Sequence, residues 1–422
     1  MRHILKQRAL KLVFLANLIS MIGSGMNGAA VSWYTLETTR SEIALGLLVV
    51  LQNLPALLLL PLTGVVIDTK DRRHLVMGLD AIRLLVIGVV AWFACRGHVP
   101  LWYLYVMNTL VSAAFWMFWP TVAALIQELA PASEFLHANT FLLAGLQGGW
   151  LIAGAIVGFV YNHIGLGGVL FIDCATYVAS FTCYFLVRRG KHLVPHPEAA
   201  HAAPRGDGAL RRYRREIQDG LAYVRAQPYV LLLGTSWALF IGGMLTQGVI
   251  TAPLSEHVLH AGALGFGWLN GGWGVGAFLS ALYAPIVIRR IGARRSVALT
   301  MALMAGGLLV LPWFPWLALG VALYCLLGSA RGVGGVAIST SMMEIVPPHL
   351  MGRVQNTFYF AGTALQMMLG LVVGWVAERH SLHGAFAIVA CLYLAAFATA
   401  LWPVPRQVAT AATSSGAAIE QQ

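Results

Sequence analysis

The sequence predicts an all-α membrane protein with twelve transmembrane helices, arranged as two six-helix bundles related by pseudo-two-fold symmetry. Three observations predict this fold. Of the 422 residues, 59% are hydrophobic and 10% are charged, whereas charged residues make up about a quarter of a soluble domain. Apolar stretches of about 20 residues, the length of one helical crossing, recur along nearly the whole chain. Short segments of the first half also return in the second half at a nearly constant separation.

Twelve apolar stretches each fit one helical crossing. The first stretch follows four basic residues, as in a secretory signal, but it exceeds the usual signal length and eleven others follow it. We therefore expect it to be a retained anchor helix. The expected spans are 11–38, 44–67, 74–95, 100–127, 135–162, 168–188, 229–255, 264–289, 295–313, 316–345, 352–378 and 384–403.

The longest polar segment, 189–227, separates a predicted N-terminal bundle (1–188) from a predicted C-terminal bundle (228–405). Its first part has the Ala, Pro and Gly content of a linker. Its second part, 210–226, alternates apolar and arginine positions at helical spacing, which predicts an amphipathic helix on an anionic membrane surface. A solvated basic linker is the alternative interpretation. Residues 406–422 have the composition of a disordered tail.

The basic residues lie mainly on one side of the predicted membrane. With the N-terminus in the cytoplasm, 22 of the 27 Lys and Arg residues are cytoplasmic, three are external and two lie inside spans. This asymmetry predicts that both termini are cytoplasmic. It also accounts for the net charge of +11, so no nucleic-acid partner is predicted.

Two kinds of segment repeat between the halves. Glu128-x-x-Pro131 returns as Glu344-x-x-Pro347, and Asn139-Thr140-Phe141 returns as Asn356-Thr357-Phe358, at separations of 216 to 217 residues. Arg72-Arg73 returns as Arg294-Arg295 at a separation of 222. Each pair falls at the same helix junction of its half. This pattern is typical of transporters with two parallel repeats and a binding site between them.

The segment from Gly64 to Arg73 resembles the signature of the major facilitator superfamily, although Thr69 and Asp71 depart from the usual residues. The resemblance covers about residues 10–405. Four segments resemble the drug:proton antiporter branch that contains macrolide-efflux and enterobactin-exporter proteins: Ser41–Arg73, Glu128–Asn139, Phe171–Val178 and Met351–Phe358. The resemblance implies the major facilitator fold and a bacterial-type inner membrane. It also implies proton-coupled efflux of a small drug-like or siderophore-like solute by alternating access.

The resemblance further implies a cytoplasmic gate at the loop between the second and third spans. Physics alone explains the arginines of this loop by orientation in the membrane, but it does not explain the aspartates, because acidic residues contribute little to topology. Asp80 and Arg83, three residues apart on the next helix, can join the same network. The predicted gate residues are Gly64, Asp68, Arg72, Arg73, Asp80 and Arg83.

Arg331 falls near the middle of the tenth span, where an arginine facing lipid is costly. It is either a structural arginine satisfied by backbone carbonyls or a residue that binds an anionic group of the substrate or a proton-coupled carboxylate. The second interpretation favours an anionic or zwitterionic solute. Other polar and aromatic residues on the expected cavity helices are Asn27, Trp116, Trp119, Trp150, Trp237, Gln247 and Trp273.

Asp173 and Glu37 are the candidate proton carriers, and both are expected toward the external face. Asp173 can equally be a helix-start residue. Gly154, Gly158, Gly370 and Gly374 form small-residue pairs at four-residue spacing, which predicts close packing of membrane helices.

The sequence contains no ATP-binding or hydrolase motif and no metal-ligand pattern, so no enzymatic activity, cofactor or metal is predicted. The expected partners are a small-molecule substrate, protons and membrane lipids, and a monomer is expected. Two other functions stay open: a carrier of lysophospholipid or other lipid, and a non-transporting receptor or scaffold.

Overall fold

The computed structural model describes residues 8–97, 99–129, 135–187, 218, 221–346 and 348–402. In these residues the regular secondary structure is helical throughout. The repeated segments around Pro131 and Pro347, most of the predicted amphipathic helix and the C-terminal tail lie outside the described residues or side chains.

The long helices follow the predicted spans within a few residues. A π-helical turn, η3 (Leu254–Val258), links α8 to α9, and a 3₁₀ turn, η4 (Leu311–Trp313), follows α10. The helices are α1 (Arg8–Thr39), α2 (Glu42–Thr69), α3 (Arg72–Ala94), α4 (Leu101–Leu129), α5 (Phe135–Leu186), α8 (Pro228–Pro253), α9 (Gly262–Ile291), α10 (Ala293–Val310), α11 (Leu317–Ile345), α12 (Pro348–Arg379) and α13 (Leu382–Leu401).

Helix α5 contains two of the predicted spans. As one straight helix, its 52 residues would measure about 78 Å, more than twice the thickness of a bilayer core. Gly165 interrupts it with φ 64° and ψ −171°, a conformation that favours glycine because it has no Cβ.

The contacts of α5 with α1 show that the chain reverses at this glycine. Before it, Gly149 packs against Met21 of α1, and residue numbers on the two helices increase together. After it, Asp173 bonds to Asn27, and Tyr184 bonds to Asn17, so the second segment runs antiparallel to α1. Eleven described helices are long and apolar enough to span a membrane. Because α5 supplies two crossings, the prediction of twelve spans is confirmed.

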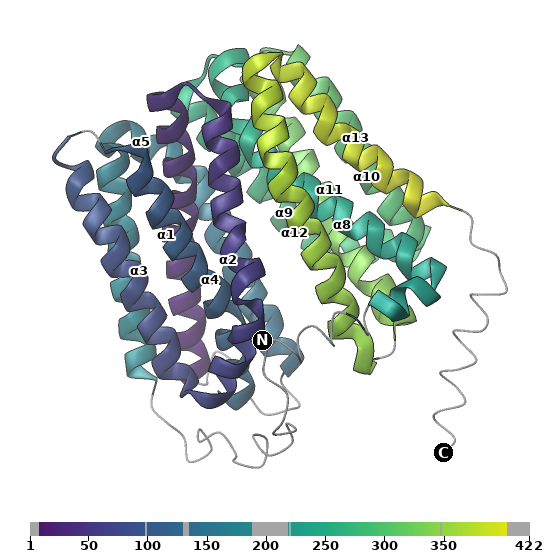
Figure 1. Ribbon diagram of the computed structural model, residues 1–422, viewed down its shortest axis with the longest axis horizontal. Helices are drawn as coiled ribbons and strands as arrows, with labels where there is room; N and C mark the ends of the chain where they lie inside the picture. Colours follow the sequence, from purple (N-terminus) through teal and green to yellow (C-terminus); the bar gives the residue numbers. More distant parts are fainter. Residues whose placement is uncertain are drawn as a thin grey trace.

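The helices form two groups, α1–α5 and α8–α13 (Figure 1). In the view of Figure 1 the groups converge at the top, where α1 turns into α2 at Arg40, and diverge toward the bottom, where α2 turns into α3 at Asp71. We call these the Arg40 end and the Asp71 end. The predicted architecture of two six-helix bundles is confirmed.

Glycines mark the places where the bundles approach most closely. A Cβ added at Gly158 of α5 would lie 2.5 Å from the backbone oxygen of Ala263 at the start of α9. A Cβ at Gly374 of α12 would lie 2.6 Å from the backbone oxygen of Glu42 on α2. Gly154 and Gly370 lie one turn away in the same two seams. Both α5 glycines match their α12 counterparts at a separation of 216, so the two seams follow the internal repeat.

Two arginines make equivalent contacts in the two halves. Arg73 Nε donates to the carbonyl of Tyr184 at 2.8 Å, near the end of α5, and Arg294 Nε donates to the carbonyl of Ala400 at 2.8 Å, near the end of α13. Arg73 and Arg294 are thus equivalent, at a separation of 221 residues. This corrects the sequence-based prediction, which used a separation of 222 and matched Arg73 with Arg295. A cation at a helix C-terminus satisfies free carbonyls and interacts favourably with the helix dipole.

Candidate functional site

Among the described residues of the N-terminal bundle, three charged ones are fully buried. Asp80 and Arg83 of α3 and Asp173 of α5 each have an exposed fraction of 0%. Asp80 lies about 12 Å along α3 from its first residue, and Asp173 lies about 12 Å along α5 from Gly165. All three residues are therefore at membrane depth, where ionisable residues are rare and usually functional.

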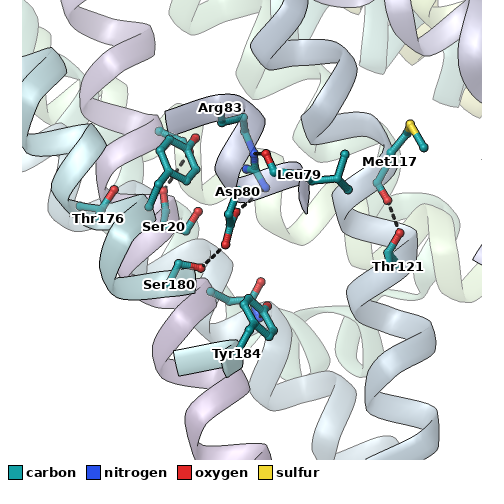
Figure 2. A network of polar contacts seen from close by, with 12 residues as sticks. Ser20, Leu79, Asp80, Arg83, Met117, Thr121, Thr176, Ser180 and Tyr184 are labelled. Carbon is teal, nitrogen blue, oxygen red and sulfur yellow. Dashed lines mark hydrogen bonds and ion pairs between the residues drawn. The ribbon is translucent and has the colours of Figure 1, made fainter. Parts of the chain in front are cut away.

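Asp80 and Arg83 form an ion pair because positions three apart lie on one face of a helix. Arg83 Nη2 lies 2.8 Å from Asp80 Oδ1, and Ser180 Oγ donates to Asp80 Oδ2 at 2.7 Å (Figure 2). The guanidinium carbon of Arg83 lies 4.1 Å from the ring centre of Phe118 and 4.8 Å from that of Tyr177. These aromatic faces add cation–π attraction to a guanidinium that has no exposed surface.

Asp173 links this cluster to α1. Asn27 Nδ2 donates to Asp173 Oδ2 at 2.6 Å, and Thr176 Oγ1 donates to Asp173 Oδ1 at 3.3 Å. Gly23 permits this approach, since a Cβ at that position would lie 2.4 Å from Asp173 Oδ1. We call Asp80, Arg83 and Asp173 the buried charge cluster.

The buried charge cluster has one more carboxylate than guanidinium. When all three groups are ionised, its net charge is −1, and an uncompensated charge in a low-dielectric interior is costly. One proton would neutralise the cluster. Its chemistry therefore suits the binding and release of a single proton.

The predicted gate is only partly visible. Gly64 and Asp68 lie outside the described side chains. Arg72 Nη1 lies 2.7 Å from Glu128 Oε1, so this arginine pairs with an acid, whereas Arg73 bonds to the helix carbonyls described above. Burial raises the pKa of Glu128, Arg72 opposes this shift, and the charge of Asp71 adds to it.

Asp80 and Arg83 lie on the next helix as expected, but in the described contacts they do not join the network of this loop. The rise of α3 carries them about 12 Å and 16 Å from its first residue, and they contact α5 and α4 inside the bundle. Asp71, which departs from the signature, starts α3 instead: its side chain accepts a hydrogen bond from the backbone amide of His74 at 3.1 Å.

Asp173 and Glu37, the predicted proton carriers, occupy different environments. Asp173 is buried within the second helical segment of α5, eight residues after Gly165, so it is not a helix-start residue. Glu37 is exposed near the end of α1, where Tyr161 donates to its Oε2 at 2.6 Å.

Arg331 lies at the midpoint of α11, with fourteen residues on either side. Its side chain is partly buried, and its Nε donates to the Sδ of Met244 on α8 at 2.8 Å. Gln247, three residues further along α8, is buried. Asn27 bonds to Asp173 of the buried charge cluster and does not lie beside Arg331.

The predicted aromatic residues do not form one cluster in the described contacts. Trp116 of α4 donates from Nε1 to the carbonyl of Gln52 at 3.3 Å and packs edge-on against Tyr359 of the other bundle. Trp273 packs edge-on against Tyr324. Trp119 and Trp237 are partly buried against apolar residues, and Trp150 is exposed.

Sequence reasoning missed the polar contacts that join the bundles at the Arg40 end. Arg40 Nη1 lies 3.1 Å from Glu256 Oε1, and His257 Nε2 lies 3.2 Å from Glu42 Oε1. Glu378 Oε2 accepts a hydrogen bond from the backbone amide of Ile43 at 3.1 Å. The four-residue spacing of Gly370, Gly374 and Glu378 is the signal that could have shown the last contact. Within the described ranges, no group of three His, Cys, Asp or Glu residues could hold a metal.

Three curated bacterial proteins are similar to this chain over long segments. The MFS-type transporter YkuC of Bacillus subtilis is 26% identical, covering 87% of this chain and 86% of its own length. The multidrug efflux pump Tap of Mycolicibacterium fortuitum is 23% identical, covering 90% and 92%. Macrolide efflux protein A of Streptococcus pyogenes is 23% identical, covering 51% and 52%. The resemblance to macrolide-efflux proteins is thus confirmed.

The fold is also that of solved transporters. A mutant form of the nucleoside transporter NupG matches with a TM-score of 0.75 and 13% identity, covering 93% of this chain and 98% of its own. The family model of the Major Facilitator Superfamily matches residues 13–364 and 248–419. The family and the structural relatives are transporters and not enzymes. This chain therefore belongs to the Major Facilitator Superfamily and is a membrane transporter.

Proposed function

We propose that this transporter exports a small organic solute, drug-like or siderophore-like, in exchange for protons across a bacterial-type inner membrane. Two of the relatives, Tap and macrolide efflux protein A, are efflux proteins by name, which supports the direction. The observation that carries the proton coupling is the buried charge cluster. Its excess carboxylate sits at membrane depth, and a carboxylate there is typical of a proton relay.

Asp173 is the proposed proton carrier because it is the carboxylate without an arginine bonded to it. Protonation would turn one Asp173 oxygen from a hydrogen-bond acceptor into a donor. The amide of Asn27 now donates to Asp173 Oδ2 at 2.6 Å, and a proton on that oxygen would turn the carbonyl oxygen of Asn27 toward it instead. The protonation state of α5 would thereby be transmitted to α1, a helix that the family uses to line the transport path.

The conformation supports alternating access between two bundles. The polar contacts and the glycine seams join the bundles at the Arg40 end, and the ribbons diverge toward the Asp71 end (Figure 1). Within the described ranges, most Lys and Arg residues lie near helix ends on the Asp71 side, which supports a cytoplasmic location for that end under the positive-inside rule. The conformation would then be closed at the outer face.

The substrate can be found by mass spectrometry of the medium and cytosol of cells with and without the gene. We expect a compound that leaves the medium and accumulates in the cytosol when the gene is lost. The transported compound is then added to proteoliposomes loaded with a pH-sensitive dye. Wild type should move protons against the solute, and Asp173→Asn should lose proton movement but keep exchange of solute for solute.

Glu37→Gln is the matched control, because Glu37 is exposed at the Arg40 end. It should keep proton movement. Proton-driven transport that survives in Asp173→Asn would refute Asp173 as the carrier. Solute transport that is unaffected by any proton gradient would refute proton coupling and favour the lipid-carrier alternative.

A further inference from the structure

The two bundles each hold one arginine at membrane depth, and they differ in how its charge is compensated. Arg83 in the N-terminal bundle is bonded to Asp80, with Asp173 in the same cluster. Arg331 in the C-terminal bundle bonds to the thioether of Met244, and a thioether sulfur is a weak acceptor. Among the side chains that the structure describes, no carboxylate lies within ion-pair distance of Arg331.

The internal repeat shows that the two arginines have comparable surroundings. Tyr177 and Tyr393 are separated by 216 residues, the separation of the repeat, and each is fully buried on the last helix of its bundle. The guanidinium of Arg83 lies over the ring of Tyr177. Arg331 bonds to Met244, and the ring of Tyr393 packs against the adjacent Gly243. The halves therefore share a buried tyrosine beside an arginine, but only the first half supplies carboxylates.

The hydroxyl of Tyr393 has no hydrogen-bond partner among the described atoms. It lies against α8 at Gly243, where an added Cβ would be 3.1 Å from the hydroxyl oxygen. Gly243 directly precedes Met244, the residue that Arg331 contacts. A buried hydroxyl without a partner and a guanidinium without a counter-charge both destabilise the ligand-free protein. Both groups are donors, and an anion would satisfy both.

We propose that Arg331 and Tyr393 form a subsite for the carboxylate or phenolate group of the transported solute. This inference rests on the proposed function and names the substrate class, a small organic anion. Arg331 is only partly buried, so part of its side chain stays accessible. Arginine also suits this role because its planar fork of donors matches a carboxylate.

The neighbouring side chains favour an anion that carries an aromatic or apolar body. Tyr324 lies two turns before Arg331 on α11, about 10 Å away along the helix, and its hydroxyl bonds to Thr251 of α8 at 2.8 Å. The ring of Trp273 packs edge-on against Tyr324 at 6.2 Å between centres. An amphipathic anion could place its charge at Arg331 and its ring toward these aromatics.

A melting experiment separates a binding arginine from a structural one. Arg331→Gln removes an uncompensated charge, so the melting temperature of the purified, ligand-free protein should stay the same or rise. Arg83→Gln is the matched control: it leaves two carboxylates buried without their arginine, and the melting temperature should fall. A fall for Arg331→Gln as large as that for Arg83→Gln would overturn the proposal.

The binding probe is 2-naphthoate, with 2-naphthamide as its uncharged counterpart. In detergent solution, 2-naphthoate should raise the melting temperature of wild type at a concentration lower by about ten-fold or more than 2-naphthamide requires. Arg331→Gln should abolish this difference, Arg331→Lys should retain part of it, and Tyr393→Phe should reduce it. Equal responses of wild type to the two compounds, including no response to either, would overturn the subsite.

These measurements need no proton gradient, so they are independent of the proposed coupling. Charge-selective binding without proton-driven transport would refute the proposed function and leave the subsite. Proton-driven transport without charge-selective binding would refute the subsite and leave the function.

Discussion

Glu378 of α12 caps the N-terminus of α2, a helix of the opposite bundle. Its Oε2 accepts hydrogen bonds from the hydroxyl of Ser41 and from the backbone amide of Ile43. Ser41 is itself the N-cap of α2 and accepts from the amide of Ala44 at 3.2 Å. A carboxylate at a helix N-terminus satisfies free amides and is favoured by the helix dipole. This contact ties the bundles together at the Arg40 end.

Glu378→Ala should therefore favour separation of the bundles at the Arg40 end. Because the contact is exposed, we expect a loss of about 0.5 to 1 kcal/mol, or a two- to five-fold change in the populations. Spin labels on Thr38 and His380, in a background without native cysteines, would report the separation by pulsed electron resonance. Arg40→Gln is the control, since the side chains of Arg40 and Glu256 are 67% and 30% exposed and such pairs contribute little. An unchanged distance distribution in Glu378→Ala would contradict the capping role.

Gly46→Ala should prevent the bundles from meeting at the Arg40 end. Its Cβ would lie 2.4 Å from the carbonyl oxygen of Gly370, and backbone atoms cannot move aside without separating α2 from α12. The matched control is Gly306→Ala on α10, where an added Cβ meets nothing within 4 Å and helix propensity should gain up to about 1 kcal/mol. We expect lost transport and a longer label distance for the first variant, and normal transport with equal or higher thermal stability for the second. Normal transport by Gly46→Ala would show that α2 and α12 need not pack this closely.

Asp80 and Arg83 should behave as one unit in a double-mutant cycle. Arg83→Met alone leaves a buried carboxylate without its partner, at a cost of about 3 kcal/mol or more. Asp80→Asn alone should also destabilise the protein. The double substitution should cost less than the sum of the single ones, because neither partner is left unpaired. Thermal unfolding in detergent measures all four proteins, and additive effects would indicate that the pair contributes no coupling energy.

The stability contribution of Glu128 should depend on pH. Its pKa in the folded protein is raised above the ordinary value of 4.5, with burial as the larger cause and Arg72 opposing it. A raised pKa means that the folded state binds the proton more tightly, so this contribution is present below about pH 4.5 and is lost as pH rises through the folded pKa. The melting temperature of wild type minus that of Glu128→Gln should therefore be largest near pH 4 and decrease toward pH 7.

Arg72→Gln tests the cause of this shift. Removing Arg72 takes away the charge that lowers the pKa of Glu128. In proteins that carry Arg72→Gln, the melting temperature with Glu128 minus that with Gln at position 128 should therefore vary more steeply with pH. A difference that grows with pH would mean that the ion pair outweighs burial.

Sequence patterns predicted the fold closely and the candidate site only in part. The bilayer sets the length of each crossing, so hydropathy locates the spans, and the repeat separation of 216 also relates Gly154 to Gly370 and Tyr177 to Tyr393. The depth of Arg331 follows from its place in its span. The sequence did not show that Ser180 bonds to Asp80, nor that Asp173 faces Asn27.

The sequence by itself determined which residues enter the membrane, because transfer into lipid depends on each residue and its immediate neighbours. Only the tertiary structure decided which polar groups meet there. Asp80 and Ser180 are 100 residues apart, and Ser41 and Glu378 are 337 apart. Their contacts depend on the rotation and tilt of whole helices, which packing across the bundles sets. For the same reason, the sequence placed an arginine at mid-membrane in each half, and the packing of the helices decided that carboxylates surround Arg83 and that Arg331 meets a thioether.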